Sequence, residues 1–323
     1  MGRRQVTENS HVGRSEAASA PRAVGETIGA GLTSALGHQL GKLCAAPLEA
    51  GLYLVSTPVG NLGDISIRAL VTLALSDMVV CEDTRHSRKL FAAYGIQRKL
   101  ETYHDFSGET DRARILAALE QGKSVALIAD AGTPLLADPG FKLVRAAVAE
   151  GFNVVPIPGA SAILPGLVAS GLPTDQFFFG GFVPPKEKAR RDALEAMRSI
   201  PGTLIVYETP ARIEATLEAL QAIFPDRPIA LARELTKLHE TFSRGTAGSL
   251  LEEARKTPPR GELVLLIAPG EKVQAADSEV EGELLKAMAA GSLKEAVEEV
   301  AKKLGVGKRQ VYNLALKIKN RQP

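Results

Sequence analysis

The sequence has little cysteine and no long hydrophobic run. Its two cysteines, Cys44 and Cys81, stand far apart and have no histidine or cysteine partners at metal-ligand spacing. Neither a disulfide framework nor a zinc site is therefore expected, and we predict no bound metal. A run of roughly 18 apolar residues, which a membrane-spanning helix would need, does not occur. These absences are typical of a reduced, cytoplasmic protein.

An excess of one charge sign is also missing. The 323 residues carry a net charge of +2, and 45% of them are hydrophobic and 24% charged. This balance is typical of a globular protein, and the length predicts two or three domains with a sizeable core. With so weak a global field, nucleic acid could be bound only through local basic patches.

Residues 1–49 precede the first predicted strand. They are rich in glycine, alanine, serine and arginine and show no sustained period, which predicts a mobile leader. The segment has no apolar core of a secretory signal, and its acidic residues disfavour an organellar presequence. These acids are Glu8, Glu16, Glu26 and Glu49.

From Gly51 onward, short apolar runs alternate with helical patterns. Helices are predicted at 67–75, 87–94, 112–120 and 140–150, and strands at 52–55, 78–81, 124–129 and 153–157. Continuously apolar strands between helices favour a largely parallel sheet that is buried on both faces. We therefore predict an N-terminal α/β domain over residues 50–170.

A linker at 171–174, Gly-Leu-Pro-Thr, is followed by a second α/β unit over residues 171–271. Its predicted helices are 187–199 and 211–223, and its predicted strands are 177–179, 203–207, 228–232 and 262–268. The proline pairs at 184–185 and 258–259 predict exposed loops.

Residues 280–323 are predicted to be mostly helical. Apolar residues at helical spacing before and after Gly305 predict a helix-turn-helix, with Lys308, Arg309, Lys317 and Lys319 on its second helix. Charged helix faces are often merely solvated. Nucleic-acid contact and a simple packing module are therefore both open interpretations of this tail.

Three loops follow predicted strands and are rich in glycine and proline: STPVGNLGD at 56–64, IADAGTPLLADPG at 128–140 and VVPIPGASAIL at 154–164. Loops at the carboxyl ends of parallel strands are where open α/β sheets bind ligands. The first loop matches neither G-x-G-x-x-G nor a P-loop, so dinucleotide and nucleoside-triphosphate sites lose support. The three loops together predict a ligand site of another kind.

These loops, with VVCEDTRHS at 79–87, resemble the tetrapyrrole methylase superfamily. FVPPKEKARR at 182–191, TLIVYETPAR at 203–212, RELTKLHE at 233–240 and the helical tail are similar to its RsmI family, the bacterial 16S ribosomal RNA (cytidine-2'-O)-methyltransferases. The resemblance covers residues 51–321. It implies a two-domain methylase with a non-Rossmann S-adenosylmethionine site between the domains. It further implies a homodimer that modifies a cytidine ribose in the decoding region of 16S ribosomal RNA, within the small ribosomal subunit.

The resemblance also implies the cofactor contacts. They are Pro58, Gly60, Leu62, Gly63, Asp64, Asp130, Ala131, Gly132, Thr133, Pro134, Leu136, Gly159, Ser161, Ala162, Glu208 and Leu235. The sequence departs from the pattern in three places: Leu62 replaces the proline of a Gly-Pro-Gly loop, Thr133 replaces the acid of porphyrin-acting relatives, and Ala211 stands where the ribosomal family has histidine.

Methyl transfer to a ribose hydroxyl needs in-line positioning and is helped by a base that accepts the hydroxyl proton. Catalytic candidates in the matched motifs are Lys186, Asp83 and Glu208, with Glu234 and Lys237 nearby. Contacts to RNA phosphates are expected from Arg85, Lys186, Arg190, Arg191, Lys237, Arg244, Lys308 and Arg309. Two alternatives stay open: a methylase of the same superfamily that acts on a corrinoid or porphyrin precursor, and a non-catalytic nucleic-acid-binding protein.

Overall fold

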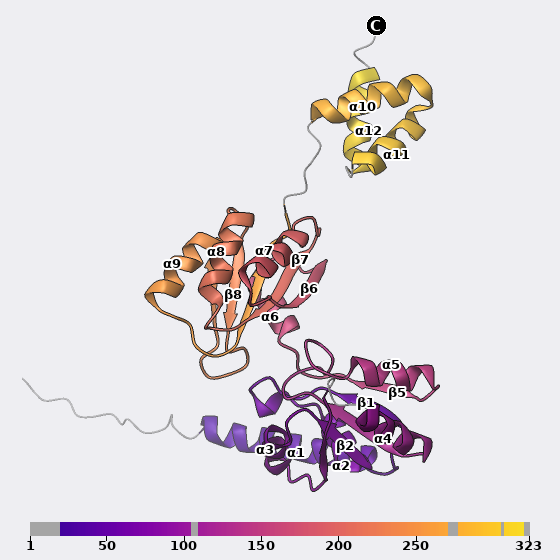
Figure 1. Ribbon diagram of the computed structural model, residues 1–323, viewed down its shortest axis with the longest axis vertical. Helices are drawn as coiled ribbons and strands as arrows, with labels where there is room; N and C mark the ends of the chain where they lie inside the picture. The colour runs from indigo at the N-terminus through magenta and orange to yellow at the C-terminus, as the bar shows by residue number, and fades with distance from the viewer. Residues whose placement is uncertain (1–19, 105–108, 271–276, 305–306, 320–323) are drawn as a thin grey trace, which may run out of the picture.

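The structure is a computed structural model of the chain, and it describes residues 20–104, 109–270, 277–304 and 307–319. Two α/β units are followed by a small helical unit (Figure 1). Within those described ranges, no helix is both long enough and apolar enough to cross a membrane.

The first sheet has five parallel strands in the order β3-β2-β4-β1-β5. β1 (Gly51–Val55), β2 (Met78–Cys81), β4 (Ser124–Ile128) and β5 (Val154–Ile157) confirm the four predicted strands. β3 (Leu100–Thr102) has no predicted counterpart, because three residues at a sheet edge carry too short a periodic signal. The central strand β4 is buried along its whole length, as its uninterrupted apolar sequence predicts.

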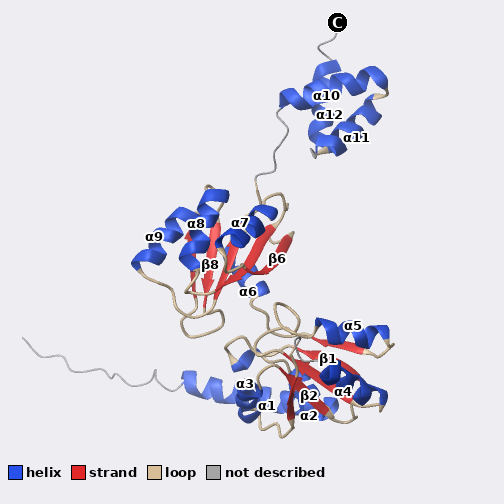
Figure 2. Ribbon diagram, in the orientation of Figure 1, coloured by secondary structure: helices blue, strands red, loops and turns tan. Residues whose placement is uncertain are grey.

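Helices cover both faces of this sheet (Figure 2). α2 (Ile67–Leu75) and α3 (Thr84–Ala93) share one hydrophobic cluster with alternate strand residues. α4 (Glu109–Glu120) and α5 (Phe141–Ala149) share another cluster with the remaining strand residues. Since all five strands are parallel and β1 lies between β4 and β5, the loops after these three strands meet at one edge of the sheet.

The second sheet has the order β6-β7-β10-β8-β9. Its strands are β6 (Phe177–Phe182), β7 (Thr203–Glu208), β8 (Ile229–Arg233), β9 (Thr241–Gly245) and β10 (Leu263–Ile267). Only β6 and β7 are parallel, and the other neighbours are antiparallel. β9 has no predicted counterpart, because its half-exposed, largely polar residues lack an apolar run.

One face of the second sheet is covered by α7 (Glu187–Ala196), α8 (Ile213–Ile223) and α9 (Ala247–Lys256), which share its main hydrophobic cluster. The other face is covered by α6 (Ile163–Ser170). This helix precedes the linker at 171–174 and yet packs on the second sheet. The chain therefore begins to pack on the second sheet at α6, before the predicted domain boundary after residue 170.

Helix α1 (Ala20–Leu43) lies within the segment predicted to be a mobile leader. The sequence pattern does not predict this helix of 24 residues within the predicted mobile leader. Alanine and leucine favour helix, and the interspersed glycines weaken the periodic signal. Residues 1–19 lie outside the described part of the chain.

The tail forms three helices, α10 (Asp277–Ala290), α11 (Leu293–Leu304) and α12 (Lys308–Lys319), which pack around a hydrophobic cluster of their own. The predicted helical tail is confirmed, although Gly305 of the predicted turn lies outside the described residues.

Candidate active site

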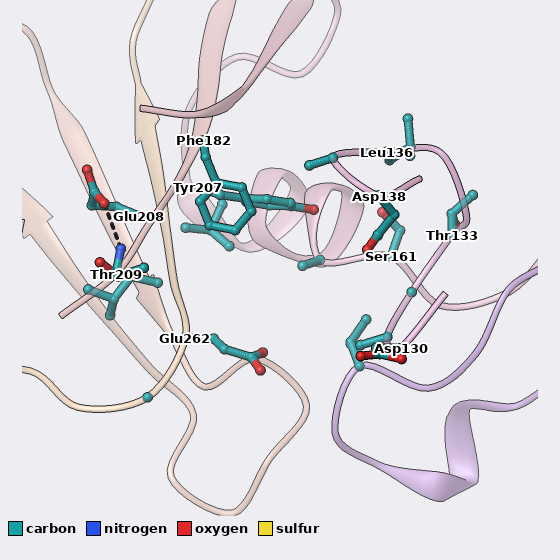
Figure 3. Close-up of a pocket in the computed structure, with 18 of the residues that line it drawn as sticks. Asp130, Thr133, Leu136, Asp138, Ser161, Phe182, Tyr207, Glu208, Thr209 and Glu262 are labelled. Atoms are coloured by element: carbon teal, nitrogen blue, oxygen red, sulfur yellow. Dashed lines mark hydrogen bonds between the residues drawn. The ribbon is translucent and has the colours of Figure 1, made fainter. Parts of the chain in front are cut away.

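A cleft lies between the two α/β units. One cavity of about 300 Å³ is lined by the loop after β4 and the start of α6, and from the second unit by the ends of β6 and β7 and the turn into β10. A second cavity of about 300 Å³ lies under the loop after β1 and shares Val59, Asp130, Ala131 and Glu262 with the first. Figure 3 shows side chains of both units around the first cavity. These volumes suit a small organic ligand.

Backbone hydrogen bonds hold the loops after β1 and β4 together. The backbone groups of Thr57 and Gly132 exchange two N–H···O bonds of 2.9 Å. Gly132 has φ +80°, and a Cβ there would lie 3.2 Å from Val59 Cγ1. A residue with a side chain would be strained at this position, so glycine lets the two loops approach one another at the cleft.

The hydroxyl of Thr133 joins three loops. Its Oγ1 lies 3.1 Å from Ser56 Oγ and donates to the Ala160 carbonyl oxygen at 3.1 Å. These bonds fix the loops after β1, β4 and β5 relative to one another. The departure from the family pattern therefore has a structural role at the rim of the cleft.

Lys237 reaches from the second unit onto the loop after β1. Its aliphatic stem occupies the space that a Cβ at Gly60 would need, and Gly60 has φ +144°. Its Nζ lies 2.8 Å from Glu234 Oε1 and 3.3 Å from Glu262 Oε2. Burial alone would lower the pKa of Lys237, but these carboxylates raise it above its ordinary value. Glu234 and Thr236 have φ of +53° and +67°, so the loop that presents Lys237 is strained.

Glu208 lines the first cavity, but its carboxylate is bonded to Thr209, as Figure 3 shows, and to residues at the start of α8. It accepts hydrogen bonds from the Thr209 N–H at 2.8 Å and the Thr216 hydroxyl at 2.6 Å. Arg212 forms an ion pair with it at 2.8 Å, and the Glu208 side chain is fully buried. Because its oxygens are occupied, Glu208 is poorly placed to accept a proton from a substrate.

Asp138 and Tyr207 face each other across the first cavity (Figure 3), and neither is among the predicted site residues. Burial, with Glu82 and Asp130 nearby, raises the pKa of Asp138 to about 6. Burial, with Asp138 and Glu262 nearby, raises the pKa of Tyr207 to about 12. Both residues stand in the motifs at 128–140 and 203–212, but the sequence gives no sign that they meet.

Most predicted cofactor residues line this cleft. The first cavity is lined by Asp130, Ala131, Gly132, Thr133, Leu136, Ser161, Ala162 and Glu208, and the second by Pro58, Gly60 and Leu62. Pro134 and Gly159 line a third cavity, which shares Thr133, Leu136 and Ser161 with the first. Gly63, Asp64 and Leu235 line none of the three: the first two lie in a short 3-10 helix (Leu62–Asp64), and Leu235 is buried against α6.

The two other catalytic candidates lie away from the first cavity. Lys186 is exposed at the start of α7. Asp83 caps α3 through the Arg85 backbone N–H at 2.7 Å and pairs with the Arg85 side chain at 2.8 Å. These bonds from Arg85 hold the pKa of Asp83 well below its usual range. A carboxylate with so low a pKa is a weak base.

The predicted RNA contacts divide into exposed and occupied groups. Lys186, Arg191 and Arg309 are exposed, and so are Arg85 and Lys308, which pair with the half-buried Asp83 and the exposed Glu298. Three other predicted contacts are buried or bonded to other parts of the protein. Arg190 is only 6% exposed, Lys237 is held by two glutamates, and Arg244 donates to the carbonyl oxygens of Ala169 and Ser170 at the end of α6. Sequence alone could not separate these groups, because arginine and lysine look alike whether exposed or buried.

Two family models match the chain: tetrapyrrole (corrin/porphyrin) methylases over residues 51–251 and the RsmI C-terminal helix-turn-helix domain over residues 274–319. The chain is 45% identical to ribosomal RNA small subunit methyltransferase I of Mesorhizobium japonicum over 278 residues, which cover 85% of this chain and 95% of the relative. Its identity to the protein of the same name from Halalkalibacterium halodurans is 43%, over 81% of this chain and 93% of the relative.

Solved structures agree on the fold. Diphthine synthase is similar with a TM-score of 0.53 and 18% identity, over 67% of this chain and 89% of that one. Cobalt precorrin-4 methyltransferase is similar with a TM-score of 0.51 and 17% identity, over 67% and 94%. The predicted two-unit methylase fold is thereby confirmed. The chain belongs to the tetrapyrrole methylase family and, within it, to the family of the ribosomal RNA small subunit methyltransferase I proteins.

Proposed function

We propose that this protein transfers a methyl group from S-adenosylmethionine to a ribose 2'-hydroxyl of a cytidine in the decoding region of 16S ribosomal RNA. The observation that carries the proposal is the cleft, which joins the three glycine- and proline-rich loops of the first unit to the second unit. The family membership and the helical tail specify a methylase that acts on the RNA of the small ribosomal subunit.

The residues of the cleft fit this cofactor. None of the described residues that line the first cavity is lysine, arginine or histidine, whereas Asp130, Asp138 and Glu262 supply negative charge. Such a wall favours a cationic ligand. Ala131, Leu136 and Ala162 provide apolar contact. When bound, S-adenosylmethionine supplies an electrophilic methyl group on a positively charged sulfur.

The protein contributes positioning, which is the main requirement of this chemistry. The Thr57–Gly132 bonds and the Thr133 hydroxyl fix the loops that would hold the cofactor. Lys237, packed on Gly60, joins the second unit to the same loops. A ribose placed beside the first cavity would then meet a preformed surface.

Exposed cations on two elements are proposed to bind RNA phosphates. Lys186 and Arg191 lie on the exposed side of α7, and Lys308 and Arg309 begin α12. Arginine can pair with a phosphate through two hydrogen bonds, and lysine acts as a point charge.

A homodimer is part of the same proposal. Leu164 and Val168 of α6 are exposed by 53% and 72%, and Phe177 and Phe178 of the edge strand β6 by 46% and 40%. Leu164 and Phe177 also line one cavity together, so the apolar surface is continuous. Large exposed apolar patches mark association sites, and a second copy of the chain would cover this one.

With a ribosomal substrate, we expect the protein to act in the cytoplasm.

The test is incorporation of label from methyl-tritiated S-adenosylmethionine into small ribosomal subunits from cells that lack the endogenous activity. We expect label in 2'-O-methylcytidine or a derivative of it, with the nucleotide mapped to the decoding region. The Gly132→Val variant should give no label, because φ +80° strains a residue with a side chain and its Cβ would crowd Val59. A wild-type protein that binds the cofactor and leaves the subunits unlabelled would contradict the proposal and favour a corrinoid-type acceptor.

A further inference from the structure

Asp138 is directed into the cleft by a strained loop. Its neighbours Leu135 and Ala137 have φ of +73° and +66°, values that are costly for residues with a side chain. Gly140, with φ +126°, ends the same loop. Two left-handed residues that are not glycine within one short loop cost free energy, and such strain is found mainly at functional sites. The loop therefore holds Asp138 in place at the expense of its own backbone.

The other acids that line the first cavity are occupied. Asp130 accepts the Asp83 N–H at 3.2 Å, Glu262 pairs with Lys237 at 3.3 Å, and Glu208 is bonded to the start of α8. No hydrogen bond or ion pair joins Asp138 to another residue that the structure describes. Among the described acids of this cavity, Asp138 thus has its carboxylate available to a ligand.

The described ionisable groups around Asp138 come from four elements, and none of them is a cation. Glu82 follows β2 and Asp130 follows β4, and both act on Asp138. Tyr207 lies on β7 across the cavity, and Glu262, which precedes β10, lines the same cavity and acts on Tyr207. Figure 3 shows the hydroxyl end of Tyr207 directed toward Asp138. In these surroundings the pKa of Asp138 is raised to about 6, by burial first and then by Glu82 and Asp130. That value lies close to the range in which a general base works best.

We propose that Asp138 is a catalytic residue that accepts the proton of the RNA hydroxyl. This inference rests on the proposed function. In the step, a bond forms between the hydroxyl oxygen and the methyl carbon, the methyl–sulfur bond breaks with its electron pair left on sulfur, and the hydroxyl proton moves to the Asp138 carboxylate.

The charge in the cleft stays balanced throughout this step. Before transfer, a positive sulfur faces an ionised Asp138, and afterwards a neutral thioether faces a protonated one. A bound cation lowers the pKa of a nearby carboxyl group. Asp138 therefore becomes ionised when the methyl donor is present and can keep the proton once the positive charge is lost. A half-buried carboxyl group without a described protein partner suits this change, whereas one paired with a lysine would remain ionised.

The test compares the Asp138→Asn variant with wild type and with Glu262→Gln, which removes a charge from the same cavity. Calorimetry would measure S-adenosylmethionine affinity between pH 5 and pH 8, a range chosen to bracket the pKa of about 6. In wild type, binding must expel the Asp138 proton at low pH. Affinity should therefore fall by up to about tenfold per pH unit below that pKa. The Asp138→Asn variant should lose this dependence, and Glu262→Gln should keep it.

Single-turnover methylation of small ribosomal subunits supplies the second readout. The rate of Asp138→Asn should fall by about 10²-fold or more at saturating cofactor, with an unchanged melting temperature as the check on folding. The rate of Tyr207→Phe, which removes a hydroxyl group from the same cavity, should fall less, and this variant should keep the wild-type pH profile of binding. A folded Asp138→Asn protein with a wild-type rate would overturn the proposal, and so would one with wild-type pH dependence of binding. If wild type itself does not methylate the subunits, the proposed function fails instead.

Discussion

Glu208 has a fully buried carboxylate that joins the end of β7 to the start of α8 through Thr209, Arg212 and Thr216. The motif TLIVYETPAR predicts a functional acid at this position, and the structure shows the hydrogen bonds of an anchor. Tyr207, the preceding residue, lies on the opposite side of the strand and faces the cleft, because side chains alternate along a strand. Of these two adjacent residues of β7, Glu208 stabilises the fold and Tyr207 lines the candidate site.

Replacing Glu208 should consequently affect stability first. The Glu208→Ala variant leaves Thr216 and the partly buried Arg212 without their acceptor, and we expect a loss of about 2–3 kcal/mol in the free energy of unfolding. Urea denaturation measures this loss. Glu195→Ala, which removes an exposed pair with Arg198, should change it by less than about 0.5 kcal/mol. If Glu208→Ala keeps native stability and yet transfers no methyl group, Glu208 has a catalytic role and the structural role proposed here is wrong.

Among the secondary-structure elements, α6 decides how the two units meet. It begins at the loop after β5, whose residues line the cleft, and it packs on the second sheet. Its end is held by Arg244, which donates to the Ala169 carbonyl at 2.6 Å and the Ser170 carbonyl at 2.9 Å. A cation at a helix C-terminus satisfies the last carbonyl groups and interacts favourably with the helix dipole.

We therefore expect Arg244 and Arg191 to behave oppositely. Arg244→Ala should lower the free energy of unfolding by about 1–2 kcal/mol and leave RNA affinity unchanged. The exposed Arg191→Ala should leave stability unchanged and reduce the salt dependence of RNA binding by about one phosphate contact. Urea denaturation and RNA binding at several salt concentrations provide the comparison. A loss of RNA affinity in Arg244→Ala at native stability would restore the predicted phosphate contact.

At the scale of the whole molecule, the helical tail is a separate packing unit. Its hydrophobic cluster consists only of residues from α10, α11 and α12. The cleft is lined entirely by the two α/β units, so the tail adds nothing to the walls of the two cavities. Cofactor binding and the contribution of the tail should thus be separable.

Deleting residues 277–323 should leave S-adenosylmethionine affinity unchanged and weaken binding to small ribosomal subunits by about tenfold, through loss of the cations on α12. Calorimetry and sedimentation with subunits would measure the two affinities. Replacing Lys308 and Arg309 by glutamine in the full chain removes two charges and keeps the tail. This variant therefore tests whether the charges of the tail or its presence alone strengthens subunit binding. Equal subunit binding with and without residues 277–323 would make the tail a packing module.

The sequence by itself determined the features that depend on neighbouring residues. Continuous apolar runs predict β1, β2, β4 and β5, and the glycine- and proline-rich segments after three of them predict the ligand loops. Helical spacing of apolar residues predicts the tail. These signals are local, because the direction of each side chain follows from the period of its own element.

Tertiary structure decided the features that depend on residues far apart in the chain. It set the mixed order of the second sheet, the packing of α6 across the predicted boundary, the burial of Arg190 and the meeting of Asp138 with Tyr207. The physical reason is that burial and nearby charge set the chemistry of an ionisable group, and both come from packing partners that no local pattern identifies. Asp83 and Asp138 look equivalent in the sequence, yet Arg85 lowers the pKa of the first and burial raises that of the second.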